Sequence, residues 1–387
     1  MLIGLGIVIN YVLRFSAIEK PNLLPILEVL GVVGLILIVL EAALDLHLVK
    51  EKVGLIIKSF LVALIGFSAT SYLSALSLNY IIGLEFLNGL LYTIPLSILS
   101  SAIILPSIYD LDDDKREFMI YESTFSDIIG IVGFYSVLTL IGPNSSGSLY
   151  EEVFGSLILT VIFSIILSYI LIYVFQKIKG NVKLFLLIAI LLLLYAVGKM
   201  FHLSSLIIIL VFGIILNNYK VFFKGGLLSL LKVERVEAVL DDMKVITAET
   251  AFVVRTFFFI IFGWSVYLGL LLNFKVVGIG LLILTIIYLV RAVVLFVFNG
   301  KDIIPQLFLA PRGLITILLF FAIPEELSAG KEFQGVLLFV ILLSCLIMTQ
   351  SLVSFKKKLK QTSLSEEADL LGEGFDSDYL EENIEEN

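Results

Sequence analysis

A group of polar side chains interrupts an otherwise apolar stretch at residues 117–141. The group contains Glu122, Ser123, Ser126 and Asp127. If the stretch is helical, Asp127 lies about 15 Å from its start, because each residue adds about 1.5 Å. Ser123 precedes Asp127 by one helical turn and shares its face, whereas Glu122 and Ser126 share an adjacent face. A hydroxyl and a carboxylate side by side supply hard oxygen ligands of the kind that suit alkali cations.

Asp127 has the chemistry of an exchange site, since one carboxylate can hold either a proton or a cation but not both. Burial disfavours the charged form of a carboxylate and brings proton binding toward neutral pH. Ionisable groups at membrane depth are costly and usually mark an ion pathway or a buried ion pair. We therefore interpret Asp127 as a shared proton and cation site. The alternative is that it pairs with a basic residue and only holds helices together.

Glu122 has a candidate partner in Arg291, which lies in the apolar stretch 276–298. Arg291 is about 10 Å from the end of its stretch, and Glu122 is about 8 Å from the start of its own. These matching depths predict an ion pair between Glu122 and Arg291, and hence a structural role for both. Removal of one partner of a buried pair leaves an uncompensated charge, at a cost of about 3–5 kcal/mol.

The elements that position these residues are membrane spans. Of the 387 residues, 59% are hydrophobic and 16% are charged, against about 45–50% and about 25% in soluble domains. Apolar runs of about 20 residues recur, which is long enough to cross a hydrocarbon layer of about 30 Å. They lack period-two alternation, which favours helices over a barrel. We predict an all-α polytopic membrane protein with about twelve spans, at 1–14, 24–47, 53–78, 86–108, 117–141, 153–176, 184–200, 203–219, 246–269, 276–298, 305–323 and 333–355.

The basic residues predict the orientation. With twelve spans, the loops on the C-terminal side hold most of the 26 Lys and Arg residues. The opposite loops hold Arg14, Lys20, Lys199, Lys275 and Lys331. This asymmetry places both termini in the cytoplasm of a cell whose inner or plasma membrane holds the protein.

The segments outside the spans, together with the His and Cys residues, predict no further binding or catalytic site. Residues 1–355 form the predicted membrane domain, and the charged residues 356–387 read as a disordered acidic cytosolic tail. The loop at 220–245 reads either as an interfacial amphipathic helix or as a plain polar linker. His47, His202 and Cys345 have no second ligand at metal-binding spacing. We therefore expect no cofactor, no metal cluster and no nucleic-acid partner.

Two spans contain helix breakers at membrane depth. The fourth span contains Pro95 and then Ser97, Ser100 and Ser101, and the eleventh contains Pro311, Arg312 and Gly313. Irregular backbone at this depth is tolerated only where it is buried in protein or lines a cavity. One interrupted helix in each half indicates an inverted-repeat transporter, with spans three to five related to spans ten to twelve. Ser100 and Ser101 are candidate ligands, as is Ser126 beside Asp127, and Ser97 reads as a small residue at a helix interface.

The motifs together resemble those of the monovalent cation/proton antiporters, the sodium/proton exchanger superfamily, over nearly all of the membrane domain. The stretch 122–127 (ESTFSD) resembles the Glu-Ser-x-x-Asn-Asp signature of that family. The segments 202–217, 252–263 and 309–314 resemble its small-residue helix, its Phe-rich span and its Arg-Gly motif, in the same order. Residues 40–45 are similar to the end of an early span in members of that family. Glu41 and Asp45 there read either as part of a cytoplasmic funnel or as a feature of the helix end.

The resemblance implies a core domain with two crossing broken helices, a dimerisation domain, and hence a homodimer. It implies that Asp127 carries the cation and the proton alternately, with Ser123 as a neighbouring ligand, and that Glu122 pairs with an Arg. Ser126 replaces the usual Asn or Asp beside the essential Asp. The resemblance therefore favours electroneutral exchange. The fourth span also lacks the Thr-Asp-Pro or Thr-Ser-Pro of many relatives.

We expect secondary active exchange of Na⁺ or K⁺ for H⁺ by alternating access, and no enzymatic activity. No Walker-type loop is present to support ATP-driven transport. The alternatives are a channel-like or sensing membrane protein on the same scaffold, with Asp127 structural, and a symporter for an organic solute. The symporter requires a larger polar cavity, and few further polar residues lie within the spans.

Overall fold

The computed structural model describes residues 2–15, 24–109, 111–141, 149–175, 183–200, 205–224, 231–265, 268–327 and 330–371. These residues form helices and connecting segments, with no strand among them. The described helical segments long and apolar enough to cross a membrane are Lys50–Ile82, Phe86–Ser107, Asp113–Ile141, Val233–Trp264, Phe274–Asn299 and Glu332–Lys358. Shorter apolar helices accompany them. The structure thus agrees with an all-α, multi-pass membrane protein, and the count of twelve crossings stays a prediction.

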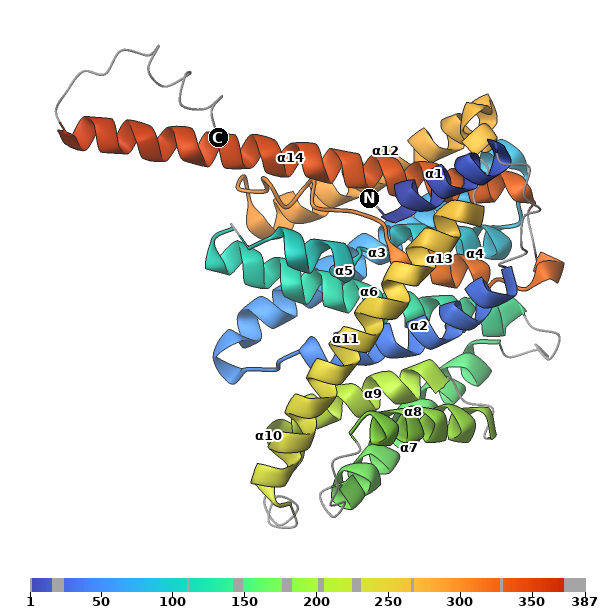
Figure 1. Cartoon of the computed structure of the whole chain (residues 1–387), viewed down its shortest axis with the longest axis vertical. Coiled ribbons are helices and arrows are strands. Elements are labelled where there is room, and N and C mark those ends of the chain that lie inside the picture. Colours follow the sequence, from blue (N-terminus) through green and yellow to red (C-terminus); the bar gives the residue numbers. More distant parts are fainter. Residues whose placement is uncertain are drawn as a thin grey trace.

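The contacts between helices divide them into two bundles, and Figure 1 shows where the labelled helices lie. The first bundle contains α1 (Leu2–Phe15), α2 (Leu24–Asp45), α7 (Leu149–Phe175), α8 (Lys183–Met200), α9 (Ser205–Asn217) and α11 (Val233–Ser265). Within it, α2 packs against α9 and α11, α7 and α8 pack against α9, and α1 packs against α11.

The second bundle contains α3 (Val53–Ile82), α4 (Phe86–Ser97), α5 (Ser101–Ile104), α6 (Asp113–Ile141), α12 (Phe274–Asn299), α13 (Leu314–Phe321) and α14 (Lys331–Leu371). In it, α3 packs against α4, α6 and α12, and α12 packs against α14. This bundle is built from the spans that the sequence divides into two related triplets. The bundles meet chiefly where α2 contacts α6 and α13, and where α6 contacts α7.

Close packing of glycines holds α1 against α11. Gly6 faces the backbone of Ile260, and Gly263 faces the backbone of Ile3, each without room for a Cβ atom. Small residues allow membrane helices to approach closely and gain van der Waals contact. The pair of glycines therefore fixes where the two helices cross.

Two spans are interrupted, as predicted. The chain leaves α4 at Ser97, passes through Ile98 and Ser100 in extended conformation, and re-enters a helix at Ser101. Pro95 lies in the last turn of α4, where its missing N–H and fixed ring favour an end to the helix. In the second interruption residues 301–313 contain no α-helix, and α13 begins only at Leu314. The predicted span at 305–323 is therefore helical only in its second part.

Two helices extend beyond the predicted spans. The first is α11, which starts at Val233, so residues 233–245 are neither a plain linker nor a separate interfacial helix. No Gly or Pro occurs in α11 before Gly263, and the residues in between include good helix formers. Likewise α14 continues to Leu371, past the expected boundary at 355. Residues 372–387 lie outside the described residues, and their disorder stays a prediction.

Candidate functional site

The two interrupted segments cross in the middle of the second bundle. The backbone N–H of Ser100 donates to the carbonyl of Pro311 at 3.0 Å. In return, the Arg312 guanidinium donates to the carbonyl of Ile98 at 2.8 Å. A Cβ atom on Gly313 would lie 2.7 Å from the Cβ of Ser100, so only glycine fits at the crossing. Polar backbone groups freed by each break are thus bonded to the other segment, as buried backbone requires.

Asp127 faces this crossing from α6 and is 1% exposed. Its Oδ2 accepts a hydrogen bond from the hydroxyl of Ser101, the first residue of α5. Its Oδ1 has no hydrogen-bond partner among the described residues, and no Lys or Arg there lies within ion-pair distance of it. Of the predicted ligands, the structure therefore brings Asp127 and Ser101 into direct contact and leaves one carboxylate oxygen open.

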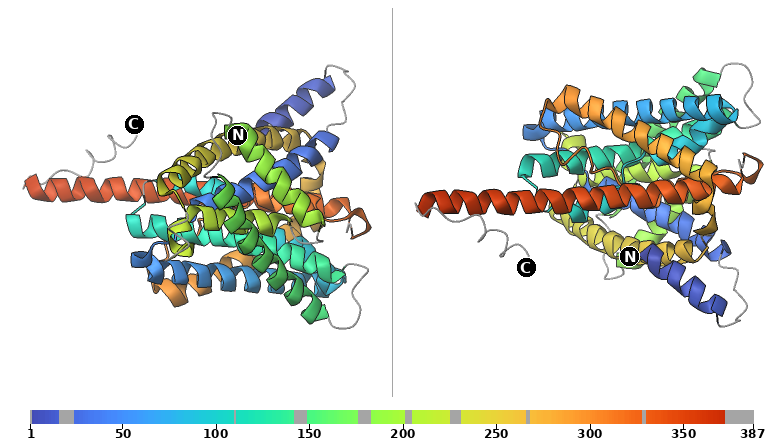
Figure 2. Two further views of the ribbon diagram at one scale, coloured as in Figure 1. Left: turned by 90° about the horizontal axis from the view of Figure 1, so that it is seen from below. Right: turned by 90° about the horizontal axis from the view of Figure 1, so that it is seen from above.

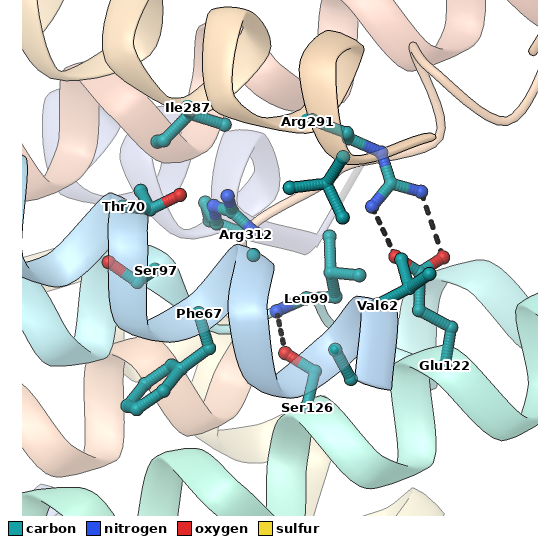
Figure 3. A pocket seen from close by; sticks show the side chains of 13 residues that line it. Val62, Phe67, Thr70, Ser97, Leu99, Glu122, Ser126, Ile287, Arg291 and Arg312 are labelled. Carbon is teal, nitrogen blue, oxygen red and sulfur yellow. Dashed lines mark hydrogen bonds and ion pairs between the residues drawn. The ribbon is translucent and has the colours of Figure 1, made fainter. Parts of the chain in front are cut away.

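The other predicted ligands have different partners. The hydroxyl of Ser123 donates to the Ile120 carbonyl of its own helix at 3.3 Å. The hydroxyl of Ser126 accepts the backbone N–H of Leu99 at 2.9 Å (Figure 3). Ser126 therefore supports the break after α4. The serine at position 100 contributes its backbone to the crossing.

The expected pair between Glu122 and Arg291 is present and buried (Figure 3). Arg291 donates to both carboxylate oxygens, at 2.6 and 3.0 Å, and also donates twice to the Gln306 carbonyl, at 3.0 and 2.8 Å. The guanidinium thereby links α6, α12 and the segment before α13. The sequence does not predict the contact with Gln306, because Arg291 binds its backbone carbonyl and not its side chain.

A second ion pair lies in the first bundle. Arg255 of α11 donates to Glu41 of α2 at 2.7 Å, and both side chains are partly buried, with 18% and 23% exposure. The sequence gives no local signal that joins the two residues, since they are 214 positions apart. Asp45 is exposed one turn further along α2.

The histidine and cysteine side chains show ordinary polar contacts where they are described. The ring of His47 lies 3.3 Å from the Lys244 ammonium, and the Cys345 thiol lies 3.7 Å from the Arg312 carbonyl. Within the described ranges no group of three His, Cys, Asp or Glu side chains is placed to hold a metal ion. His202 lies outside those ranges.

The sequence matches the family described as sodium/hydrogen exchanger, transmembrane, over residues 1–357. The chain belongs to the sodium/hydrogen exchanger family. This exchanger is therefore a multi-pass membrane transporter that exchanges Na⁺ for H⁺.

Solved structures agree with the exchanger fold. The chain is similar to the sodium proton antiporter MjNhaP1 from Methanocaldococcus jannaschii at pH 8, with a TM-score of 0.69 and 19% identity over 91% of each chain. An electron-microscopy structure of MjNhaP1 gives a TM-score of 0.66 and 18% identity, over 94% of this chain and 91% of that one. No curated protein sequence matches the chain.

Proposed function

We propose that Asp127 is the carrier group, which binds Na⁺ and H⁺ alternately. The observation that supports this role is its isolation. Asp127 is buried at the crossing, and Oδ1 has no partner among the described residues. A buried carboxylate oxygen left without a partner is costly. A proton or a cation on that oxygen removes the cost, and the two compete for it.

Ser101 positions the carboxylate in this proposal, because its hydroxyl donates to Oδ2 and leaves Oδ1 for the transported ion. Further oxygen ligands would come from Ser100, Ser123 and backbone carbonyls freed by the breaks. Hard oxygen ligands of this kind suit Na⁺ and K⁺, so the proposal covers both ions.

Transport follows if the second bundle, which carries Asp127, moves as a unit against the first. The interface between the bundles is limited mainly to α2 against α6 and α13, and to α7 against α6. Such a limited interface favours relative motion. Exchange is electroneutral in this scheme. Ser126 stands beside Asp127 where a second acid would be needed for an extra proton.

The assembly and location complete the proposal. We infer a homodimer formed through the first bundle, in the inner or plasma membrane, with both termini in the cytoplasm. The excess of Lys and Arg in the loops on the C-terminal side supports this orientation.

The deciding experiment uses Asp127→Asn and Asp127→Ala in vesicles that contain a pH-sensitive dye. Both variants should fold, judged by a single symmetric peak in size-exclusion chromatography, and should lose Na⁺-driven proton flux. The control is Asp302→Asn, because Asp302 is an exposed carboxylate of the same bundle. Saturable, pH-coupled flux retained by folded Asp127→Ala would refute the assignment.

A further inference from the structure

A small cavity lies beside the crossing and does not include Asp127 among its lining residues. Its volume is about 30 Å³, enough for a small ion or about two water molecules. Its polar lining comes from α3, α4, α6, α12 and the segment before α13 (Figure 3). The polar residues are Thr70, Ser97, Glu122, Ser126, Arg291 and Arg312.

The charges around the cavity do not cancel. Glu122, Arg291 and Arg312 are 1%, 8% and 2% exposed. Both oxygens of Glu122 are bonded to Arg291. No carboxylate among the described residues lies within ion-pair distance of Arg312, whose Nη1 donates to the Ile98 carbonyl. That carbonyl, just after α4, supplies only a partial negative charge, so one buried positive charge remains in excess.

The polar groups of the cavity that still lack a partner are hydrogen-bond donors. The Nε of Arg312 is buried and has no hydrogen-bond partner in the described structure. Since Ser126 uses its oxygen to accept from Leu99, its hydroxyl hydrogen is free to donate. Thr70 adds a second hydroxyl to the lining, whereas Ser97 already donates to the Thr93 carbonyl.

We propose that this cavity binds a small monovalent anion of the chloride type, held by Arg312, Ser126 and Thr70. An isolated buried charge is strongly disfavoured unless it is paired and hydrogen-bonded. Water would satisfy the donors but would leave the charge of Arg312 uncompensated. A bound anion accepts hydrogen bonds from the donors and also compensates the charge of Arg312. It thereby links α3 and α6 to the segment that leads into α13.

Thermal unfolding of the purified protein tests the proposal. Chloride should replace gluconate stepwise at fixed Na⁺ concentration, pH and ionic strength. A ligand that binds only the folded protein raises Tm with ligand concentration. We therefore expect a chloride-dependent rise in Tm whose half-effect concentration can be fitted, with bromide acting alike. A Tm that does not respond to chloride or bromide would mean that the cavity holds only water, and would overturn the proposal.

Thr70→Val removes one anion donor while keeping the side-chain shape. We expect the half-effect chloride concentration to rise about tenfold, the equivalent of one hydrogen bond to a charged group. Thr247→Val is the matched control. Thr247 lies on α11 of the first bundle, is fully buried, and has no hydrogen-bond partner among the described residues. An equal change in both variants would count against the site.

A crystallographic measurement on the unaltered protein does not depend on how the variants fold. Crystals grown with bromide should show an anomalous peak next to the Arg312 guanidinium, and a dataset without a peak there would overturn the proposal. Because Asp127 does not line the cavity, neither result bears on its role as carrier.

Discussion

Ser126 accepts the backbone N–H of Leu99 at 2.9 Å, and this bond joins α6 to the break between α4 and α5. The residue next to Asp127 thus holds the backbone two positions before Ser101, whose hydroxyl bonds Asp127. The bond therefore fixes the position of Asp127 on α6 relative to Ser101 at the start of α5.

Ser126→Ala should weaken this alignment. A buried N–H left without an acceptor costs about 1–3 kcal/mol, so we expect a lower Tm and a higher apparent KM for Na⁺ in vesicle flux. Ser136→Ala is the control, since that hydroxyl donates to the Val132 carbonyl of its own helix at 2.7 Å and has no other partner among the described residues. Identical behaviour of the two variants would show that the bond to Leu99 has no special role.

Glu122→Gln should destabilise the second bundle by about 3–5 kcal/mol, because Arg291 would remain buried and charged without a carboxylate. The double variant Glu122→Met with Arg291→Met should recover most of that loss, since apolar side chains carry no uncompensated charge. Denaturation in detergent measures both. Asp302→Asn breaks an exposed pair with Lys115 and should change stability by about 0–1 kcal/mol. A double variant no more stable than the single one would contradict this account.

Gly6→Val should separate α1 from α11, because its side chain would collide with the backbone of Ile260. Overpacking of this kind costs about 1–3 kcal/mol, measurable as a lower Tm and faster proteolysis. Gly4→Val lies in the same helix with nothing within 4 Å of its Cβ position, and should behave like the unaltered protein. Comparable losses in both variants would argue against the glycine contact.

Competition at Asp127 fixes the sign of the pH dependence. Protons and Na⁺ share one carboxylate in the proposed mechanism. A lower pH on the side from which Na⁺ binds therefore raises the apparent KM for Na⁺ without lowering the maximal rate. Where the carboxyl is mostly protonated, each pH unit should change KM by about tenfold by mass action. Initial rates over a pH series in vesicles measure it. A maximal rate that falls while KM stays constant would exclude simple competition.

Electroneutral exchange predicts that an imposed membrane potential leaves the transport rate unchanged. One positive charge enters for each that leaves, so the potential does no net work on the cycle. Vesicles in which a gradient of the permeant anion thiocyanate sets the potential provide the test, because no gradient of a transported cation is then imposed. A rate that rises or falls steadily with the imposed voltage would show that the cycle moves net charge.

Features that depend on local helical geometry could be predicted from the sequence. The four-residue spacing places Glu122 and Ser126 on one face of α6, and both line the cavity while Asp127 does not. Depth along the helices likewise paired Glu122 with Arg291. Features that depend on backbone groups could not be predicted. The carbonyls of Ile98 and Gln306 bind Arg312 and Arg291, and a carbonyl leaves no trace in residue identity.

Charge density misled the placement of helix ends for a related reason. The charges at 234–244 favour either a separate interfacial helix or a linker, yet α11 continues through them as one helix. A helix requires backbone hydrogen bonds but does not require lipid around it. The residue at which a span leaves the membrane therefore need not be the residue at which its helix ends.

The length of α14 has a mechanical consequence. Its 41 residues extend about 60 Å, twice the thickness of a hydrocarbon layer of about 30 Å. Its far part projects past both bundles (Figure 2), while its near part packs on α12 in the bundle that carries Asp127. In the proposed motion of the second bundle, α14 would move with it as a lever, and a tilt of about 10° would shift a tip about 30 Å away by about 5 Å. Under that proposal, the position of the far end of α14 would report which side of the membrane the ion site faces.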